Sequence, residues 1–288
     1  MKPILFTVLA LSVLSLTSCV TTKPNGPEPT GNAPAARHPA LLATAYPQQA
    51  AEYRALAKQV FQVAASQLDA ALADPKWSAL PGKQEGPANK PPAVIVDVDE
   101  TILDNTPWQV RAMRGGYSYP EGWQEWCMEG RAQAIPGALA FARLAASKGV
   151  TIFYVSNRKA PVEEGTRTNL KALGFPLSAE RDTVLLRYEK EEWGSDKTSR
   201  RQLVATDFRV VMMFGDNLGD FLRTDPPKAS PTIRAKAVDA HASYWGTRWY
   251  VLPNAMYGSW EGALLEGATL SGDARHQRLL EKLDAAED

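Results

Sequence analysis

The stretch Ala93-Val94-Ile95-Val96-Asp97-Val98-Asp99-Glu100-Thr101 decides the fold of this chain. Its first four residues are small or β-branched and apolar, and so short an apolar run predicts a buried strand rather than a helix. Acidic residues then occupy three of the next four positions. A carboxylate at the end of a buried strand is costly unless a cation or another partner compensates its charge. Taken alone, this triplet is equally consistent with an acidic, solvated turn.

Two further apolar runs, at 151–155 and 210–214, also end in polar residues. The first leads into Ser156-Asn157-Arg158, and the second into Gly215-Asp216-Asn217-Leu218-Gly219-Asp220-Phe221. Short strands are also expected at 183–186 and 248–252, and helices at 136–148, 161–173, 195–206 and 274–285, the third of these capped by Ser195. This alternation predicts an α/β fold with a Rossmann-like parallel sheet and helices on both faces. Ligand sites in such sheets lie at the carboxyl ends of the strands, so the polar segments are expected to form one site.

Two segments lie outside this pattern. Residues 47–73 carry apolar side chains at steps of three and four, which predicts an amphipathic helix that ends at Asp74-Pro75. Residues 104–135 have little periodicity but a high density of aromatic side chains, namely Trp108, Tyr117, Tyr119, Trp123 and Trp126. This density is consistent either with a small, mainly helical cap over the site or with ordinary core packing.

The first 45 residues indicate an exported protein. Residues 1–18 are typical of a secretory signal, and Leu16-Thr17-Ser18-Cys19 resembles a bacterial lipobox that would make Cys19 a lipidation site. A plain signal peptide with a chance cysteine is the alternative. Residues 19–45 are rich in Pro, Gly, Asn and Thr and are expected to form a flexible tether. Val20 after the cysteine favours an outer-membrane lipoprotein, held by its lipid anchor and facing the periplasm or the cell surface.

Charge and cysteine content limit the possible partners. The chain has 288 residues, of which 32 are basic and 32 acidic, so its formal net charge is zero. Domains that bind nucleic-acid polymers usually carry a basic excess, and no such partner is expected here. Only one other cysteine, Cys127, is present. If Cys19 is lipidated, Cys127 has no disulfide partner and is expected to be a small core residue.

Four motifs occur in order along the chain: Asp97-Val98-Asp99-Glu100-Thr101-Ile102-Leu103-Asp104-Asn105, then Ser156-Asn157-Arg158, then Gly215 to Phe221, then Leu252-Pro253-Asn254-Ala255-Met256-Tyr257-Gly258-Ser259-Trp260-Glu261. Together they resemble the haloacid dehalogenase-like phosphohydrolases, and within them the class C bacterial acid phosphatases, which are lipoprotein 5′-nucleotidases of the bacterial outer membrane. The resemblance runs from about residue 46 to about residue 267. It implies a phosphatase domain over 46–288, with a core at about 90–103 and 136–253. The cap is expected at about 104–135 together with the helix at 47–73.

The resemblance also implies the chemistry of the site. Asp97 is expected to be the nucleophile that takes up the phosphoryl group, and Asp99 to protonate the leaving alcohol and then activate water. Mg2+ is expected to bind the carboxylates of Asp97 and Asp216 and the backbone carbonyl of Asp99. Asp220 is expected to orient a water on the ion. Stabilising a helix N-terminus is its other possible role, and the two are compatible.

Phosphate oxygens are expected to be bound by Ser156, by the Asn157 backbone that follows it and by one lysine, and Ser156 and Lys197 are counted with the catalytic residues. Ser156 has the alternative role of a helix cap. Lys197 matches the family's lysine best by position, with Lys190 as its competitor. Arg158 either adds charge to the site or is an exposed surface residue.

The family resemblance implies a substrate as well. Nucleoside 5′-monophosphates, including nicotinamide mononucleotide, are expected, with the base stacked between Trp123 and Tyr257 and with Trp126 in reserve. Two alternatives remain: a broad-specificity acid phosphatase, and a surface ligand-binding lipoprotein with vestigial catalysis. The partners implied are small phosphomonoesters and the membrane lipid, with a homodimer as a further possibility.

Overall fold

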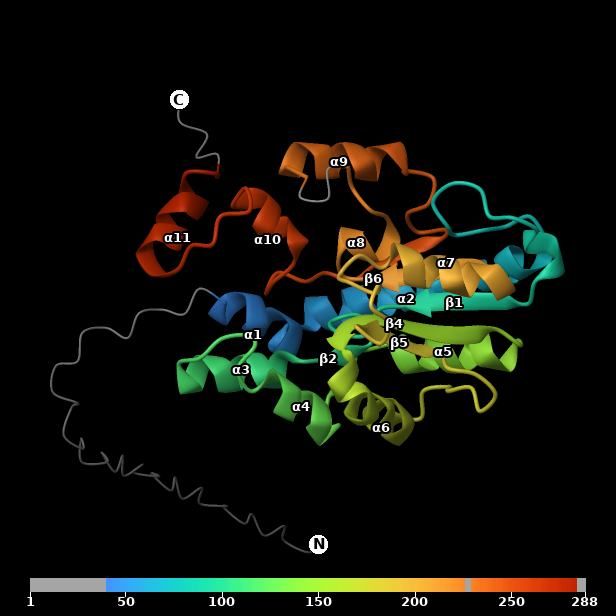
Figure 1. Cartoon of the computed structure of the whole chain (residues 1–288), viewed down its shortest axis with the longest axis horizontal. Helices are drawn as coiled ribbons and strands as arrows, with labels where there is room; N and C mark the ends of the chain where they lie inside the picture. Colours follow the sequence, from blue (N-terminus) through green and yellow to red (C-terminus); the bar gives the residue numbers. More distant parts are fainter. Residues whose placement is uncertain (1–39, 226–228, 284–288) are drawn as a thin grey trace, which may run out of the picture. The chain divides into compact units, whose positions relative to one another are not determined.

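The computed structural model describes residues 40–225 and 229–283 (Figure 1). The predicted signal peptide, Cys19 and most of the predicted tether lie outside these residues. The strands are β1 Pro92–Val96, β2 Leu103–Asp104, β3 Gln133–Ala134, β4 Thr151–Lys159, β5 Val184–Arg187, β6 Arg209–Gly215 and β7 Trp249–Val251. The helices are α1 Leu41–Gln49, α2 Ala51–Ala73, α3 Thr106–Gly115, α4 Trp123–Glu129, α5 Ala138–Ser147, α6 Glu163–Leu173, α7 Thr198–Asp207, α8 Leu218–Phe221, α9 Pro231–Ala240, α10 Ser259–Leu264 and α11 Gly272–Leu280.

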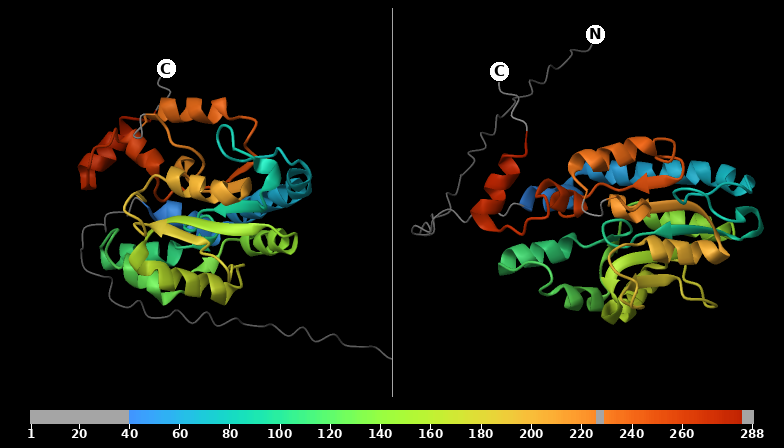
Figure 2. Two further views of the ribbon diagram at one scale, coloured as in Figure 1. Left: turned by 45° about the vertical axis from the view of Figure 1, so that its right-hand side comes forward. Right: turned by 45° about the horizontal axis from the view of Figure 1, so that its top comes forward.

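Five strands form one parallel sheet in the order β5-β4-β1-β6-β7. Successive side chains of β1 point to opposite faces, so that Val94 and Val96 enter one hydrophobic core and Ala93 and Ile95 enter another. Helices therefore cover both faces of the sheet (Figure 2). This arrangement confirms the predicted α/β class.

Helix α2 packs on the sheet. Its buried side chains recur at steps of three and four, and one of them, Phe61, stacks on Phe214 of β6 with ring centroids 5.4 Å apart. Phe141 of α5 lies 4.7 Å from the same ring. This helix was grouped with the cap and was also expected to pack on the sheet, and its apolar stripe is buried against β6, β7 and α5. The predicted helix is also divided at Ala50, whose backbone is extended.

Two other helix starts differ from the predictions. Helix α1 begins at Leu41, so residues 41–45 are helical although they were predicted to belong to the tether. Helix α7 begins at Thr198, with Lys197 rather than Ser195 at its N-cap position. The side chain that accepts the first free N–H of α7 is that of Asp196, whose Oδ1 lies 2.8 Å from the Thr198 nitrogen. A carboxylate nearer to the helix thus replaces the predicted serine cap.

The segment predicted to form the cap contains α3 and α4. Strands β2 and β3 pair in antiparallel fashion and hold its two ends together. Helix α4 lies against α6, and the two backbones approach closely: a Cβ added at Gly165 would lie 2.4 Å from the carbonyl oxygen of Cys127. The aromatic side chains pack among themselves, with the ring of Trp108 5.1 Å from that of Trp123. The cap is thus tied to the core through α6.

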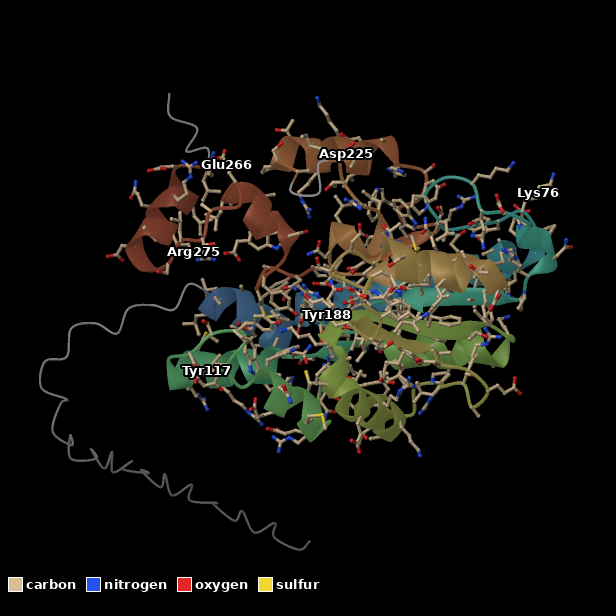
Figure 3. All side chains as sticks on the ribbon, in the orientation of Figure 1. Lys76, Tyr117, Tyr188, Asp225, Glu266 and Arg275 are labelled. Carbon is tan, nitrogen blue, oxygen red and sulfur yellow. The ribbon has the colours of Figure 1, made fainter. Side chains whose placement is uncertain are left out.

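A salt bridge joins the two C-terminal helices, α10 and α11. Arg275 of α11, which is labelled in Figure 3, forms a salt bridge of 2.5 Å with a carboxylate oxygen of Glu261 in α10. Among the described residues, no helix combines the length and the apolar character that crossing a membrane requires.

Candidate active site

Three strands of the sheet bring their polar ends to one place. Val96, the last residue of β1, pairs with Tyr154 of β4 and with Phe214 of β6. The residues that follow on each strand, including Asp97, Ser156 and Asp216, therefore meet at the carboxyl edge of the sheet, as predicted. The backbone N–H of Asp97 donates to the carbonyl of Phe214 at 2.9 Å and fixes the turn after β1.

Lys197 lies between two carboxylates. Its Nζ forms an ion pair with Asp97 and a second one, at 2.6 Å, with Asp220, and its residue is only 4% exposed. Burial lowers the pKa of this lysine, but Asp220 and Asp97 outweigh burial and leave the pKa above its ordinary value. Lys190 instead lies on the surface, with its Nζ 4.8 Å from the ring of Trp193. Of the two candidate lysines, the fold therefore brings Lys197 to the carboxylates.

Asp97 is the most buried of the strand-end aspartates, at 6% exposed. Burial raises the pKa of its carboxyl group to about 7, against the lowering effect of Lys197. Thr101 donates its hydroxyl to Oδ2 of Asp97 at 3.3 Å. A bound cation would lower the pKa of Asp97 further and would keep the carboxylate ionised, as a nucleophile requires.

Asp97, Asp216 and Asp220 could hold a cation, because one carboxylate oxygen of each lies within 4.8 Å of the others. Burial, Asp220 and Asp97 raise the pKa of Asp216 well above its ordinary value, and Asn254 holds this carboxylate through an Nδ2 donor at 2.7 Å. Oxygen ligands and an excess of negative charge are what a hard divalent ion such as Mg2+ requires. The residues present therefore fit a metal ion, and Asp220 belongs to the same carboxylate cluster.

Asp99 has an environment of its own. Arg158 approaches its Oδ1 at 2.9 Å and Asn105 donates Nδ2 to the same oxygen at 2.8 Å, while the Ser156 hydroxyl lies 3.4 Å from Oδ2. Arg158 is only 2% exposed, so the structure decides between the two roles left open for it. It is a buried partner of Asp99. These contacts orient the carboxyl group that was predicted to act as the acid and base.

Trp126 supports this arrangement from behind. It is 3% exposed, and its indole N–H donates to Oδ1 of Asn105 at 2.8 Å. Such burial argues against the contact with the nucleotide base for which Trp126 was held in reserve. Trp123 is half-buried, with the guanidinium of Arg158 5.7 Å from its ring centroid, and Tyr257 is half-buried in the loop after β7. Within the described part of the chain, no ring contact joins Trp123 to Tyr257.

The predicted phosphate-binding turn is held by Arg200. Its guanidinium donates to the Ser156 carbonyl at 2.5 Å and to Oδ1 of Asn157 at 2.7 Å. The Asn157 side chain in turn donates to the Ser195 carbonyl at 3.0 Å. Ser156 Oγ accepts the backbone N–H of Arg158 at 3.0 Å. The Asn157 side chain therefore fastens the loop before α7 to the turn.

Sequence reasoning missed several positioning residues, namely Thr101, Asn105, Arg200, Arg201 and Asn254. Arg201 donates to the carbonyls of Gly219 and Asp220 at 2.9 and 3.0 Å and so holds the loop that carries the aspartates. Asn105 is the last residue of the first motif, and this position was the only indication of its role. Arginine and asparagine side chains are usually solvated, so their residue types alone do not predict a buried role. Cys127 is buried in the core, as predicted, and burial raises the pKa of its thiol to about 12.

Comparison with known proteins agrees with this geometry. A family model described as the HAD superfamily, subfamily IIIB (acid phosphatase), matches residues 31–260. Two solved structures of class C acid phosphatase from Bacillus anthracis, one with tungstate bound, are similar to this chain, each with a TM-score of 0.74. Their identities are 36% and 35%, over 86% of this chain and 97% of theirs. The Stem 31 kDa glycoprotein of Glycine max is 28% identical over 132 residues, which are 44% of this chain, and the match spans about half (51%) of that relative.

Proposed function

This chain belongs to subfamily IIIB of the HAD superfamily, the acid phosphatases, and from that membership we propose that it is a Mg2+-dependent phosphomonoesterase acting on nucleoside 5′-monophosphates. The membership confirms the resemblance that the motifs indicated. The observation that carries the proposal is the cluster of Asp97, Asp216, Asp220 and Lys197, in which all but the half-buried Asp216 are buried. Asp99, two residues from Asp97, is held by its own partners.

The proposed reaction has two steps. A carboxylate oxygen of Asp97 attacks phosphorus, the ester P–O bond breaks, and Asp99 gives its proton to the leaving alcohol. Asp99 then takes a proton from water as the water oxygen attacks the aspartyl phosphate, which releases phosphate and restores Asp97. Arg158 and Asn105 keep the Asp99 carboxyl in place for both proton transfers.

Mg2+ would be held by the carboxylates of Asp97 and Asp216 and by the backbone carbonyl of Asp99, with Asp220 in reach of the same ion. When bound, such an ion reduces the repulsion between Asp97 and phosphate and stabilises charge on the equatorial oxygens. Tungstate, bound by the Bacillus anthracis relative, is a tetrahedral oxyanion like phosphate. Binding of such an oxyanion by a similar protein supports the proposal that this chain also binds a phosphate group.

A substrate panel tests the nucleotide preference. We expect phosphate release to require Mg2+, to stop with a chelator, and to favour 5′- over 3′-mononucleotides and an aryl phosphate. Trp123→Ala and Tyr257→Ala are expected to lower kcat/KM for nucleotides about tenfold or more, since stacking is worth roughly 1–3 kcal/mol per base. The exposed Tyr188 provides the matched control, as Tyr188→Ala.

The outcomes of this panel separate the rival functions. Equal rates on all substrates, unchanged in the Trp123 and Tyr257 variants, would contradict the nucleotide preference and leave a broad-specificity acid phosphatase. No release from any substrate would contradict catalysis and leave a ligand-binding lipoprotein.

We also propose that Cys19 is lipidated and holds the enzyme on the outer membrane. A charged nucleotide crosses membranes poorly, so an enzyme outside the inner membrane that removes phosphate would leave a nucleoside for salvage. In cells fed with radiolabelled palmitate, the wild-type protein is expected to be labelled and to sediment with outer membranes. Cys19→Ser is expected to lose the label and the sedimentation, and an unlabelled wild-type protein would contradict the proposal.

A further inference from the structure

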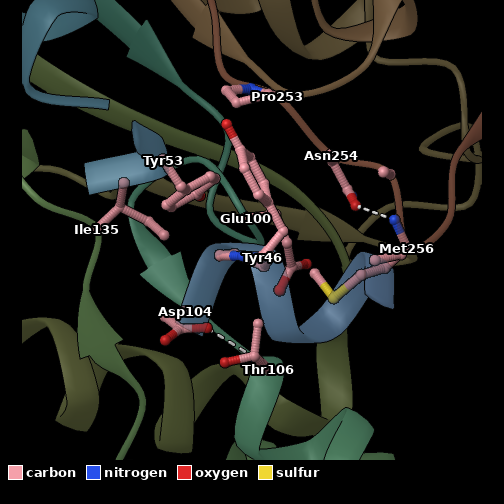
Figure 4. A pocket seen from close by; sticks show the side chains of 12 residues that line it. Tyr46, Tyr53, Glu100, Asp104, Thr106, Ile135, Pro253, Asn254 and Met256 are labelled. Atoms are coloured by element: carbon pink, nitrogen blue, oxygen red, sulfur yellow. Dashed lines mark hydrogen bonds between the residues drawn. The ribbon is translucent and has the colours of Figure 1, made fainter. Parts of the chain in front are cut away.

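A pocket lined by residues of α1 and α3 lies beside the cluster of Asp97, Asp216 and Asp220 (Figure 4). It includes about 420 Å³ of space that no protein atom fills, part of which is open solvent. Its walls come from α1, α2, the turn after β1, the start of α3, Ile135 and the loop after β7. Asn254 belongs both to the pocket and to the aspartate cluster, because it lines the pocket and its Nδ2 donates to Asp216 at 2.7 Å. A molecule with its phosphate at Asp97 therefore has this pocket beside it.

The pocket is acidic. Its lining includes the carboxyl groups of Glu100 and Asp104, and none of the twelve residues that the structure places around it is basic. Glu100 is 2% exposed, and its Oε1 accepts the backbone N–H of Asn105 at 3.0 Å. Its Oε2 has no hydrogen-bond partner among the described residues, and the same holds for the buried hydroxyl of Thr106. Buried polar atoms of this kind usually have a partner, which points to a ligand or water.

The charge of this pocket is not compensated by the neighbouring site. Lys197 is paired with Asp97 and Asp220, and Arg158 with Asp99. If a divalent ion binds as in the proposed function, it compensates Asp97 and Asp216. Glu100 and Asp104 then remain without a cation. Burial, followed by Asp99 and Asp216, raises the pKa of Glu100 well above its ordinary value, and a cation in the pocket would favour the charged form of this carboxyl group.

The remaining walls favour an organic cation over a metal ion. The rings of Tyr46 and Tyr53 stand edge to face, with centroids 5.9 Å apart, and Ile135, Pro253 and Met256 add apolar surface. Aromatic rings together with carboxylates bind ammonium and other organic cations. A bare metal ion would instead need oxygen ligands on most sides.

We propose that this pocket binds an organic cation carried by the leaving group of the substrate. The inference rests on the proposed phosphomonoesterase activity and adds a substrate class to it: phosphate esters whose alcohol bears a positive charge. Glu100 and Asp104 supply the opposite charge, Tyr46 and Tyr53 supply ring surface, and Asn254 connects the pocket to the phosphate site.

The test uses a pair of substrates that differ in charge alone. Phosphocholine and 3,3-dimethylbutyl phosphate have nearly the same shape, but only the former carries a cation. The full-length protein is expected to show a kcat/KM about tenfold higher for phosphocholine, the size of one cation–π and ion contact. In Glu100→Gln and Asp104→Asn this ratio is expected to fall toward one. Both amides keep the oxygen that accepts the backbone N–H of Asn105 or Thr106.

Controls separate this inference from its premise. Asp69→Asn removes an exposed charge of the same kind and is expected to leave the ratio unchanged. An aryl phosphate reports the folding and the phosphatase activity of every variant, so the loss of that activity would count against the proposed function rather than the pocket. A wild-type ratio near one, or a high ratio that persists in both pocket variants, would overturn the inference. So would calorimetry with Mg2+ that showed a second bound ion lost in Glu100→Gln, because a metal ion would then occupy the pocket.

Discussion

Replacing Asp97 by Asn is expected to reduce phosphate release at least about a thousandfold, because the amide cannot attack phosphorus and form the covalent intermediate. The loss should appear in kcat with every substrate, including an aryl phosphate. Burial raises the pKa of the Asp97 carboxyl, so the fold does not favour its charge, and a neutral amide of the same shape is expected to leave stability nearly unchanged. The Thr101 hydroxyl can still donate to the amide oxygen.

The measurement is steady-state phosphate release together with acid quenching of enzyme mixed with a radiolabelled substrate. Wild-type protein is expected to retain label as an acid-stable acyl phosphate, and Asp97→Asn to retain none. Asp207→Asn, at the surface end of α7, is the control for a lost carboxylate. Activity of Asp97→Asn within tenfold of wild type would exclude Asp97 as the nucleophile.

The second large effect is expected for Lys197→Met. Methionine fills much of the same volume but leaves Asp97 and Asp220 buried without the cation that now lies between them. Breaking a buried ion pair by removing one partner costs about 3–5 kcal/mol, so the free energy of unfolding should fall by about that amount in the absence of divalent ions. Since the lysine is also expected to stabilise charge on the transferred phosphoryl group, kcat/KM should fall about a hundredfold or more.

Lys190→Met is the matched control, because the same substitution removes a surface lysine seven positions earlier. Urea unfolding and phosphate release would be measured on both variants, with and without Mg2+. We expect Lys190→Met to resemble wild type in both. A larger loss of activity in Lys190→Met than in Lys197→Met would reverse the assignment of the phosphate lysine.

Local sequence does not distinguish the surroundings of Lys190 from those of Lys197. Both follow the same strand, and either is compatible with a lysine at the start of a helix. What distinguishes them is the loop between β5 and α7, which Arg200 and Asn157 hold against the neighbouring strand. These contacts join residues about forty positions apart, and no local pattern records them.

Arg158 and Trp126 illustrate the same limit. An arginine after a strand is usually solvated, and a tryptophan in a cap can face either the ligand or the core. Their burial follows from contacts among segments distant in sequence, in which Asn105 connects Trp126 to the arginine that holds Asp99. The packing of α2 on the sheet likewise involves a distant segment, because Phe61 stacks on Phe214 of β6.

By itself, the sequence determined the parallel sheet, the positions of Asp97, Asp99 and Asp216 at strand ends, and the family. Strands and helices can be predicted from sequence because their regular backbone geometry places apolar side chains at fixed intervals along the chain. The sequence favoured Lys197 over Lys190 by position, but only the tertiary structure showed that Lys197 pairs with Asp97 and Asp220. The tertiary structure alone decided which groups hold Asp99, and that Glu100 and Asp104 share an acidic pocket. The partner of a buried charge depends on contacts between distant segments of the chain. The free-energy cost of leaving that charge unpaired is larger than the conformational preferences of nearby residues.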